Sequence, residues 1–194
     1  MQPDSEKGEP EMSERFLTVT FSDGRTATYP AGTPVRDLLP RAPDPGSAPV
    51  LGALVNNEVR CLTCPVVADV QVEFLTIQSP LGWRIYRSTM AFLLSKTVEN
   101  LYPEADYAVE HSLGSGLFCR FEPAGRERRD EDVRRIEDAL RELVEADRPI
   151  HRRQIAFADA VRQFQNEWQM DKYKLLRFRN QPYIDVVECD GAID

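Results

Sequence analysis

Residue types that often carry chemistry are scarce in this chain of 194 residues, which has four cysteines and two histidines. Cys61 and Cys64 have the spacing of a metal-ligand pair, but a zinc site needs four ligands and no second pair of this kind follows. The pair also lies in an expected strand and turn rather than at the start of a helix, which argues against a thioredoxin-type redox site. We therefore expect two buried or half-buried thiols, no metal and no other cofactor.

One histidine, His111, stands between a carboxylate and a hydroxyl, in the order Glu110, His111, Ser112. Neighbouring residues of a strand point to opposite faces of a sheet, so these three side chains cannot meet as a catalytic triad. If His111 faces a cleft it could bind a ligand, and a structural hydrogen bond is the alternative. Gly114 and Gly116 are not followed by the lysine of a phosphate-binding loop, so we expect a hairpin turn there.

The charge and composition exclude several classes of partner. A net charge of −8 argues against broad attraction to nucleic-acid backbones or anionic membranes. The sequence has no apolar run of about 18 residues, as a transmembrane helix needs, and its acidic start does not resemble a signal peptide. Four cysteines are too few for a disulfide scaffold in a chain of this size. We predict a cytoplasmic protein that binds neither DNA nor membranes.

Two groups of basic residues depart from this acidic average. Arginines gather between residues 126 and 153, where interleaved acids dilute their charge. The second group alternates in pairs along an expected strand over residues 173–178 and comprises Lys172, Lys174, Arg177 and Arg179. Each group could be a track for RNA or a solvated surface, and we favour the solvated surface.

A helix expected over residues 87–101 positions the most informative side chains. Apolar residues at helical spacing form one side, namely Met90, Leu94, Val98 and Leu101. The opposite arc carries Ser88, Ser95, Lys96 and Glu99, with Phe92 near its middle. An aromatic ring in a polar arc is an exposed ring, a lid contact or the floor of a cleft. Pro103 prevents the helix from continuing.

The remaining elements follow from periodicity and turn signals. Before the helix we expect strands over residues 15–21, 25–29, 50–55, 59–62 and 70–77, with a hairpin turn at Asp23-Gly24 and a short helix capped by Thr33. After it we expect a hairpin over residues 109–121, a helix capped by Asp130, a strand over 150–155, a helix over 157–168, and strands over 173–178 and 183–187.

Several stretches resemble known families. L-T-V-T-F-S-D-G-R-T-A-T-Y-P-A-G-T-P-V and A-L-V-N-N-E-V resemble the TGS domain, a ubiquitin-like β-grasp fold whose implied role is ligand or RNA contact. R-S-T-M-A-F-L-L is similar to R-H-S-x-A-H-L-L, the helix opening of the editing domain of threonyl-tRNA synthetases, also known as the threonyl/alanyl-tRNA synthetase second additional domain. N-L-Y-P-E-A and E-H-S-L-G-S-G-L-F-C-R-F resemble the amino-terminal half of uridine-kinase-like proteins, which are nucleoside kinases.

The resemblance covers residues 15–194 and implies an α+β fold. It predicts a disordered acidic tail over residues 1–14, a β-grasp TGS domain over 15–79, and an α+β editing-like domain of threonyl-tRNA synthetase type over 80–194. The kinase-like relatives continue beyond this point. No phosphate-binding loop is present in this sequence, so we do not expect kinase activity from this chain on its own.

The reactive positions of the editing domain are replaced in this sequence. The resemblance places the two histidines of H-x-x-x-H on Ser88 and Phe92, and the cysteine and histidine of C-x-x-x-H on Val187 and Gly191. Such imidazoles share one helical face because they are four residues apart. Cys189 is two positions from the expected cysteine. We therefore predict no editing by that mechanism.

The leading prediction is a non-catalytic accessory module that binds a nucleotide or a tRNA-like RNA and tunes a linked or separate kinase domain. Its candidate ligand-binding residues are Ser88, Phe92, His111, Tyr183 and Asp185. At Phe92 the ring could stack on a base or fill the old pocket, and we favour filling. One alternative is a diverged aminoacyl-tRNA deacylase using His111, Asp185 and Cys189. The other is a protein-interaction module.

Overall fold

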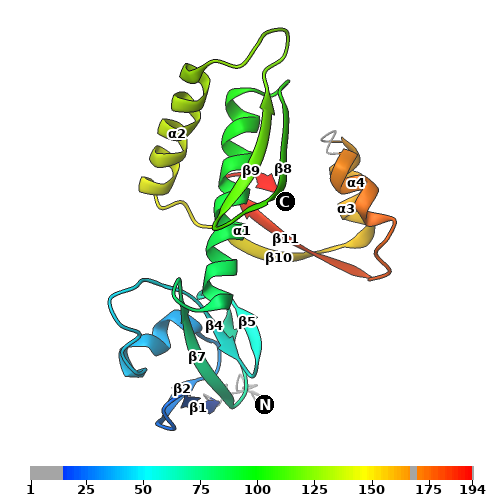
Figure 1. Ribbon diagram of the computed structural model, residues 1–194. Coiled ribbons are helices and arrows are strands. Elements are labelled where there is room, and N and C mark those ends of the chain that lie inside the picture. The colour runs from blue at the N-terminus through cyan, green and yellow to red at the C-terminus, as the bar shows by residue number, and fades with distance from the viewer. Residues whose placement is uncertain (1–14, 167–169, 194) are drawn as a thin grey trace, which may run out of the picture. The chain divides into compact units, whose positions relative to one another are not determined.

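The computed structural model describes residues 15–166 and 170–193 of the chain (Figure 1). Its contacts divide the chain into two units, residues 1–86 and 87–194, and the boundary falls within the helix α1 (Pro80–Leu101). The tail predicted over residues 1–14 lies outside the described residues. No helix in the described part of the chain is long and apolar enough to cross a membrane.

The helix α1 begins at Pro80, well before the residue 87 expected from the sequence. Ser79 caps it, because its hydroxyl accepts the backbone N–H of Gly82 at 3.0 Å, and Pro80 takes the first helical position. A Cβ on Gly82 would lie 1.9 Å from the carbonyl oxygen of Thr76, so only glycine fits there. The pair Ser79-Pro80 therefore forms the start of a helix.

A five-stranded sheet forms the first unit, in the order β2-β1-β7-β4-β5. Its strands are β1 (Phe16–Phe21), β2 (Thr26–Pro30), β4 (Val50–Val55), β5 (Glu58–Arg60) and β7 (Val70–Thr76). β1 and β7 are parallel, and the other neighbours are antiparallel. The hairpin predicted at Asp23-Gly24 joins β1 to β2, and Gly24 adopts the positive φ of 84° that such turns favour.

The core of the first unit comes from alternating residues of β1 and from a short 3₁₀ segment, η1 (Val35–Arg41). Leu17, Val19 and Phe21 are buried because every second residue of a strand faces the same side. Val35 and Leu38 from η1 are 1% and 0% exposed. Just before η1, β3 (Thr33–Pro34) pairs with β6 (Pro65–Val66), so Thr33 does not cap a helix as predicted.

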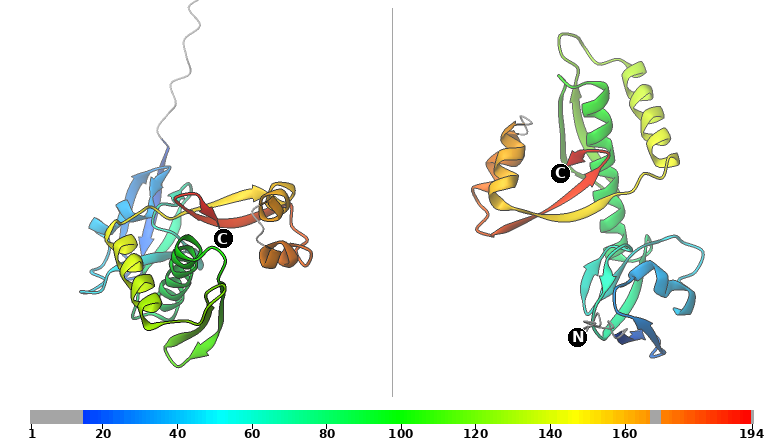
Figure 2. Two further views of the ribbon diagram at one scale, coloured as in Figure 1. Left: turned by 90° about the horizontal axis from the view of Figure 1, so that it is seen from above. Right: turned by 180° about the vertical axis from the view of Figure 1, so that it is seen from behind.

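The second unit combines helices with two antiparallel ribbons (Figures 1 and 2). After α1 come the hairpin strands β8 (Asp106–Leu113) and β9 (Gly116–Glu122), then the helix α2 (Asp130–Glu145). The second ribbon pairs β10 (His151–Ala156) with β11 (Tyr183–Cys189), and β12 (Ala192–Ile193) extends it. The helices α3 (Phe157–Asn166) and α4 (Met170–Leu176) connect β10 to β11 and lie at that end of the ribbon (Figure 2).

The strand predicted over residues 173–178 is wrong, because this segment belongs to α4 and the turn that follows it. A short apolar run does not by itself distinguish a strand from a buried helical turn. Leu176 belongs to a buried cluster with Phe164 of α3 and Val186 of β11, and Tyr173, three residues earlier, packs against this cluster. Tertiary packing at helical spacing therefore decides the structure of this segment.

Candidate functional site

The residue at the centre of the predicted cleft, Phe92, is buried. Its side chain is 8% exposed and packs with Leu93 of α1 and Cys189 of β11. Four further apolar residues surround these three, namely Leu140, Leu143, Ile150 and Val187. We call this group the α1–β11 cluster. The arc of α1 that was expected to be polar therefore packs against β11, and the ring is not exposed as a lid.

Lys96 lies one helical turn after Phe92 and was not among the candidate residues. It is only 5% exposed, and its Nζ donates a hydrogen bond to the carbonyl oxygen of Cys189 at 2.6 Å. Nζ also lies 3.5 Å from Oδ2 of Asp190, which is 46% exposed. A buried lysine needs partners of this kind because removing its charge from water is costly. The only feature of the sequence that indicated its position is the four-residue spacing from Phe92, which places both side chains on one face of the helix.

The four positions matched to the editing chemistry have different surroundings. Phe92 and Val187 belong to the α1–β11 cluster. Ser88 is exposed on α1. Gly191 lies in the turn between β11 and β12 with φ of 82°. The structure thus brings together an aromatic ring and an aliphatic side chain where the resemblance expects an imidazole and a thiol.

His111 lies on the β8–β9 hairpin, where it is exposed and stacks on Phe118 with ring centroids 4.9 Å apart. Its neighbour Ser112 accepts a hydrogen bond from Arg87 of α1 at 2.7 Å, which ties the hairpin to the helix. Within the described residues, no hydrogen bond or ion pair joins His111 to Asp185 or Cys189. Cys189 is 1% exposed and belongs to an apolar cluster, where a thiol is inert.

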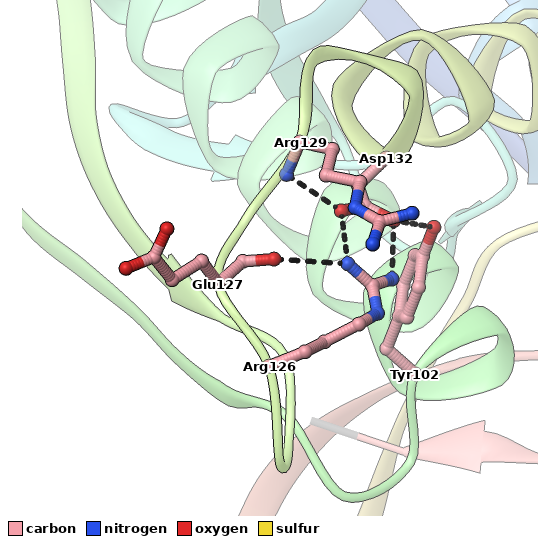
Figure 3. A network of polar contacts seen from close by, with 5 residues as sticks. All are labelled: Tyr102, Arg126, Glu127, Arg129 and Asp132. Carbon is pink, nitrogen blue, oxygen red and sulfur yellow. Dashed lines mark hydrogen bonds and ion pairs between the residues drawn. The ribbon is translucent and has the colours of Figure 1, made fainter.

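A polar network fixes the start of α2 (Figure 3). Asp132 is 6% exposed and accepts two hydrogen bonds from the Arg126 guanidinium, at 2.6 and 2.7 Å. It also accepts the Tyr102 hydroxyl at 3.0 Å and the backbone N–H of Arg129 at 2.9 Å. Asp132 therefore closes a capping box with Arg129, and the cap predicted at Asp130 is wrong because Asp130 already lies within the helix.

Ionisation in this network follows from its contacts. The Arg126 guanidinium, followed by the Arg129 N–H, holds the pKa of Asp132 well below its usual value of 3.8. Burial, followed by the hydrogen bond to Asp132, raises the pKa of the Tyr102 hydroxyl. Arg135 lies over the Tyr102 ring, 5.7 Å from its centroid. Its described members are all paired, and it joins Tyr102, which directly follows α1, to the loop after β9 and to α2, so we interpret it as structural.

A second region on β11 is open. A cavity of about 330 Å³ lies between α3, α4 and β11, and its lining comprises Phe164, Lys172, Leu175, Leu176, Arg179, Gln181, Ile184, Asp185 and Val186. We call it the α4–β11 cavity. It has an apolar floor and a charged rim, the usual composition of a ligand site. Lys172 donates to the carbonyl oxygen of Ile193 at 3.1 Å, and Asp185 forms an ion pair with Arg152 at 3.1 Å.

Exposed apolar and cationic side chains occur in the same segments as the residues that line this cavity, and of these Leu175 and Arg179 belong to the lining itself. Leu175, Phe178 and Tyr183 are 63%, 73% and 58% exposed. The Arg177 guanidinium lies over the Phe178 ring, 4.9 Å from its centroid. Neither Arg177 nor Arg179 has a carboxylate partner among the described residues. Two of the candidates, Tyr183 and Asp185, lie here on β11, while Ser88, Phe92 and His111 belong to other elements.

The cysteine pair of the first unit is not two thiols as predicted. Cys61 and Cys64 form a disulfide, with Cα atoms 5.4 Å apart. The pair occupies the turn between β5 and β6, where chain reversal brings residues three apart close enough for a bond. Residues 15–166 and 170–193 contain no cluster of three or more metal-ligating side chains.

Comparison with known proteins identifies a consistent set of relatives, although no family model matches the chain. It is 28% identical to a threonine–tRNA ligase of Pelodictyon phaeoclathratiforme over 174 residues, which are 89% of this chain and 24% of that protein. It is 27% identical to the enzyme of a Geobacter species over 82% of the chain and 25% of the enzyme. For the Desulforamulus reducens enzyme the identity is 24% over 90% of the chain and 27% of the enzyme.

The chain therefore spans about a quarter of the length of the curated relatives it matches. The similarity supports a region like the amino-terminal part of a threonyl-tRNA synthetase, with a mixed α+β fold. These relatives lend no support to the predicted link with uridine kinases.

Proposed function

We propose that this chain is a non-catalytic accessory region, similar to the amino-terminal part of threonyl-tRNA synthetases, that binds RNA or a nucleotide. The α1–β11 cluster is the observation that carries the first half of this proposal. Phe92, Val187 and Cys189 share one apolar cluster, in which Phe92 and Cys189 are 8% and 1% exposed. Lys96 fills the next turn of α1 with a bond to the Cys189 carbonyl. Phe92 and Val187 cannot act as the general base that activates a water molecule for hydrolysis.

The first unit supports a β-grasp domain of TGS type over residues 15–79. Its strand order β2-β1-β7-β4-β5 places the first strand beside the last one in parallel, with antiparallel hairpins on either side. The second proposed domain covers residues 80–194. The chain's contacts divide at residue 86, within α1, whereas the proposed boundary precedes this helix.

The α4–β11 cavity supports the binding half of the proposal. Arg179 in its lining and Arg177 two residues earlier provide cations for phosphate groups, and Phe178 and Tyr183 provide exposed rings close to lining residues in the sequence. Single-stranded RNA is bound by this combination, because each base offers a face for stacking and the backbone is anionic. Because the chain as a whole has a net charge of −8, we expect RNA to contact it at this local group of cationic residues rather than over the rest of its surface. The idea that this chain tunes a linked or separate kinase domain remains a proposal, and neither the fold nor the relatives support it.

A diverged deacylase is the competing proposal, and it would need His111, Asp185 and Cys189 to act together. Cys189 is 1% exposed, whereas His111 is exposed on a different ribbon and stacked on Phe118. Asp185 is already paired with Arg152. These surroundings favour binding over hydrolysis.

The test of the non-catalytic half is a deacylation assay with mischarged tRNA. We expect hydrolysis at the rate of buffer alone, for the natural chain and for Cys189→Ala. Turnover well above that background, lost in Cys189→Ala, would establish the deacylase instead.

The test of the binding half is fluorescence anisotropy with a labelled acceptor-stem hairpin that has a single-stranded 3′ end. The variant Arg177→Gln/Arg179→Gln should bind more weakly by about tenfold and show a smaller dependence of log Kd on log salt. Arg162→Gln is the matched control, because Arg162 is an exposed arginine of α3 that pairs with Asp159. Equal losses in the control and the double variant would contradict an RNA site at the cavity.

A further inference from the structure

The disulfide in the turn between β5 and β6 is not used by the proposed function. Cys61 and Cys64 are both partly exposed, so a small thiol in solution can reach their sulfur atoms. Their bond closes a ring of only four residues. In the chain-entropy account, so short a loop constrains the unfolded chain much less than a long one. A bond with a small structural benefit and an accessible position is suited to reversible chemistry.

The ring is joined by hydrogen bonds to the start of η1. The carbonyl oxygen of Cys64 accepts the backbone N–H of Val35 at 3.0 Å, and that of Leu62 accepts the N–H of Arg36 at 2.9 Å. Inside the ring, the Cys64 N–H donates to the Cys61 carbonyl oxygen at 3.1 Å. Val35 is 1% exposed, so the residue that the ring holds in place also belongs to the core of the first unit.

We propose that Cys61 and Cys64 form a reversible thiol–disulfide exchange site whose redox state controls how firmly η1 is held. A small thiol of the glutathione class is the reductant. Its thiolate attacks one sulfur and forms a mixed disulfide while the other cysteine leaves as a thiolate. A second thiol then attacks the mixed disulfide. The chain gains two electrons and two protons and ends with two thiols, while the two small thiols end as their disulfide.

Thr63 is a positioning residue for this exchange. Its hydroxyl lies 3.4 Å from Sγ of Cys61, and a disulfide sulfur carries no proton, so the hydroxyl is the donor. When the bond opens, the same hydroxyl stabilises a thiolate on Cys61. Because a stabilised thiolate leaves faster, Cys61 is the leaving group and Cys64 receives the incoming thiol.

The direct test equilibrates the full chain with reduced and oxidised glutathione at a series of ratios. Peptide mass spectrometry after alkylation under denaturing conditions reports Cys61 and Cys64 separately from Cys119 and Cys189. We expect the 61–64 bond to follow the glutathione ratio. Two results would overturn the proposal: both residues remaining thiols in oxidised glutathione, or the bond resisting excess reduced glutathione.

The coupling to η1 is tested by amide hydrogen exchange of the oxidised and reduced chain. On reduction, exchange at residues 35 and 36 should be about fivefold faster, the change expected when one ordinary hydrogen bond is weakened. Peptides covering β8 and β9 are the internal control and should not change. The double variant Cys61→Ser/Cys64→Ser should exchange like the reduced chain in both buffers. Identical exchange at residues 35 and 36 in both redox states would contradict the coupling.

The role of Thr63 is tested with Thr63→Val, which keeps the shape and removes the hydroxyl. In the reduced chain, alkylation of Cys61 should shift to higher pH, while the pH profile of Cys64 stays the same. An unchanged Cys61 profile would remove Thr63 from the exchange, and a shift of both cysteines would indicate a merely structural effect.

Discussion

The two faces of β11 line regions with opposite properties. Because side chains alternate along a strand, Val187 and Cys189 face the α1–β11 cluster, whereas Ile184 and Val186 face α3 and α4. The first region is a cluster of buried and half-buried apolar side chains, with the Lys96–Asp190 ion pair beside it. The second holds a cavity of about 330 Å³ with a cationic rim and exposed rings. One strand thus contributes both to a packed cluster and to the lining of an open cavity.

This difference bears on how far the resemblance to synthetase editing domains can guide the choice of a ligand site. The resemblance points to α1 and the end of β11, yet Phe92 and Val187 at these positions belong to the α1–β11 cluster, Ser88 is exposed and Gly191 lies in a turn. The cavity with its charged lining residues lies instead beside α3, α4 and the first part of β11. The following predictions separate the two regions, from the largest expected effect to the smallest.

The same substitution in the two regions should affect different properties. Phe92→Ala should lower the free energy of unfolding by about 3 kcal/mol, because it leaves a cavity in the α1–β11 cluster. Phe178→Ala, at a ring that is 73% exposed, should change it by less than about 0.5 kcal/mol. Urea unfolding measures both. Equal losses at the two sites would contradict the division into a packed and an open region.

A buried lysine and an exposed one give a second matched pair. Lys96→Met should cost about 2 kcal/mol of stability, because the carbonyl oxygen of Cys189 loses its donor in a buried position. Lys174→Met, on the exposed part of α4, should be close to neutral. Thermal unfolding of the two variants is the measurement. A neutral Lys96→Met would mean that this bond does not hold α1 to β11.

The rings beside the cavity should matter for binding rather than folding. Phe178→Ala should weaken binding of a single-stranded RNA end by about tenfold, since one base loses its stacking partner. Phe118→Ala is the matched control, because Phe118 is 45% exposed on the β8–β9 hairpin and stacks on His111. Anisotropy titrations compare the two. A larger loss with Phe118→Ala would move the binding surface to the hairpin and restore His111 as a ligand residue.

The network around Asp132 predicts a pH dependence that neither region shares. The pKa of Asp132 is lowered in the folded chain, so its contribution to stability is fully present above the unfolded value near 3.8. The contribution is lost as the pH falls below that value towards the lower folded pKa. Asp132→Asn should therefore be less stable than the natural chain at pH 7, and the difference should shrink below pH 4. Urea unfolding between pH 3 and pH 7 tests this, and a difference that stays constant would contradict it.

Elements with strong local signals could be predicted from the sequence. The β1–β2 hairpin follows from Asp23-Gly24 between alternating residues, and α2 follows from apolar residues at helical spacing. Both signals arise from residues close together in the chain, so no distant contact is needed to interpret them.

Features decided by distant contacts could not be predicted. Lys96 on a polar arc is expected in water, and only its contact with the end of β11, 93 residues away, shows that it is buried. Tyr173 and Leu176 were expected in a strand, and only their packing in a cluster with residues of α3 shows that their segment is helical. The Cys61–Cys64 bond depends on the path of the turn rather than on the spacing alone. The sequence does show the basic residues near the α4–β11 cavity as a group. It predicts a strand for them, whereas they lie in α4 and the turn after it.

The most direct test of the division on β11 is amide hydrogen exchange of the full chain with and without an acceptor-stem RNA hairpin that ends in a single strand. Our account predicts protection in residues 172–185, beside the α4–β11 cavity, and unchanged exchange in residues 88–96 of α1. Protection of residues 88–96 without protection of residues 172–185 would place the ligand at the positions matched to the editing residues and contradict it.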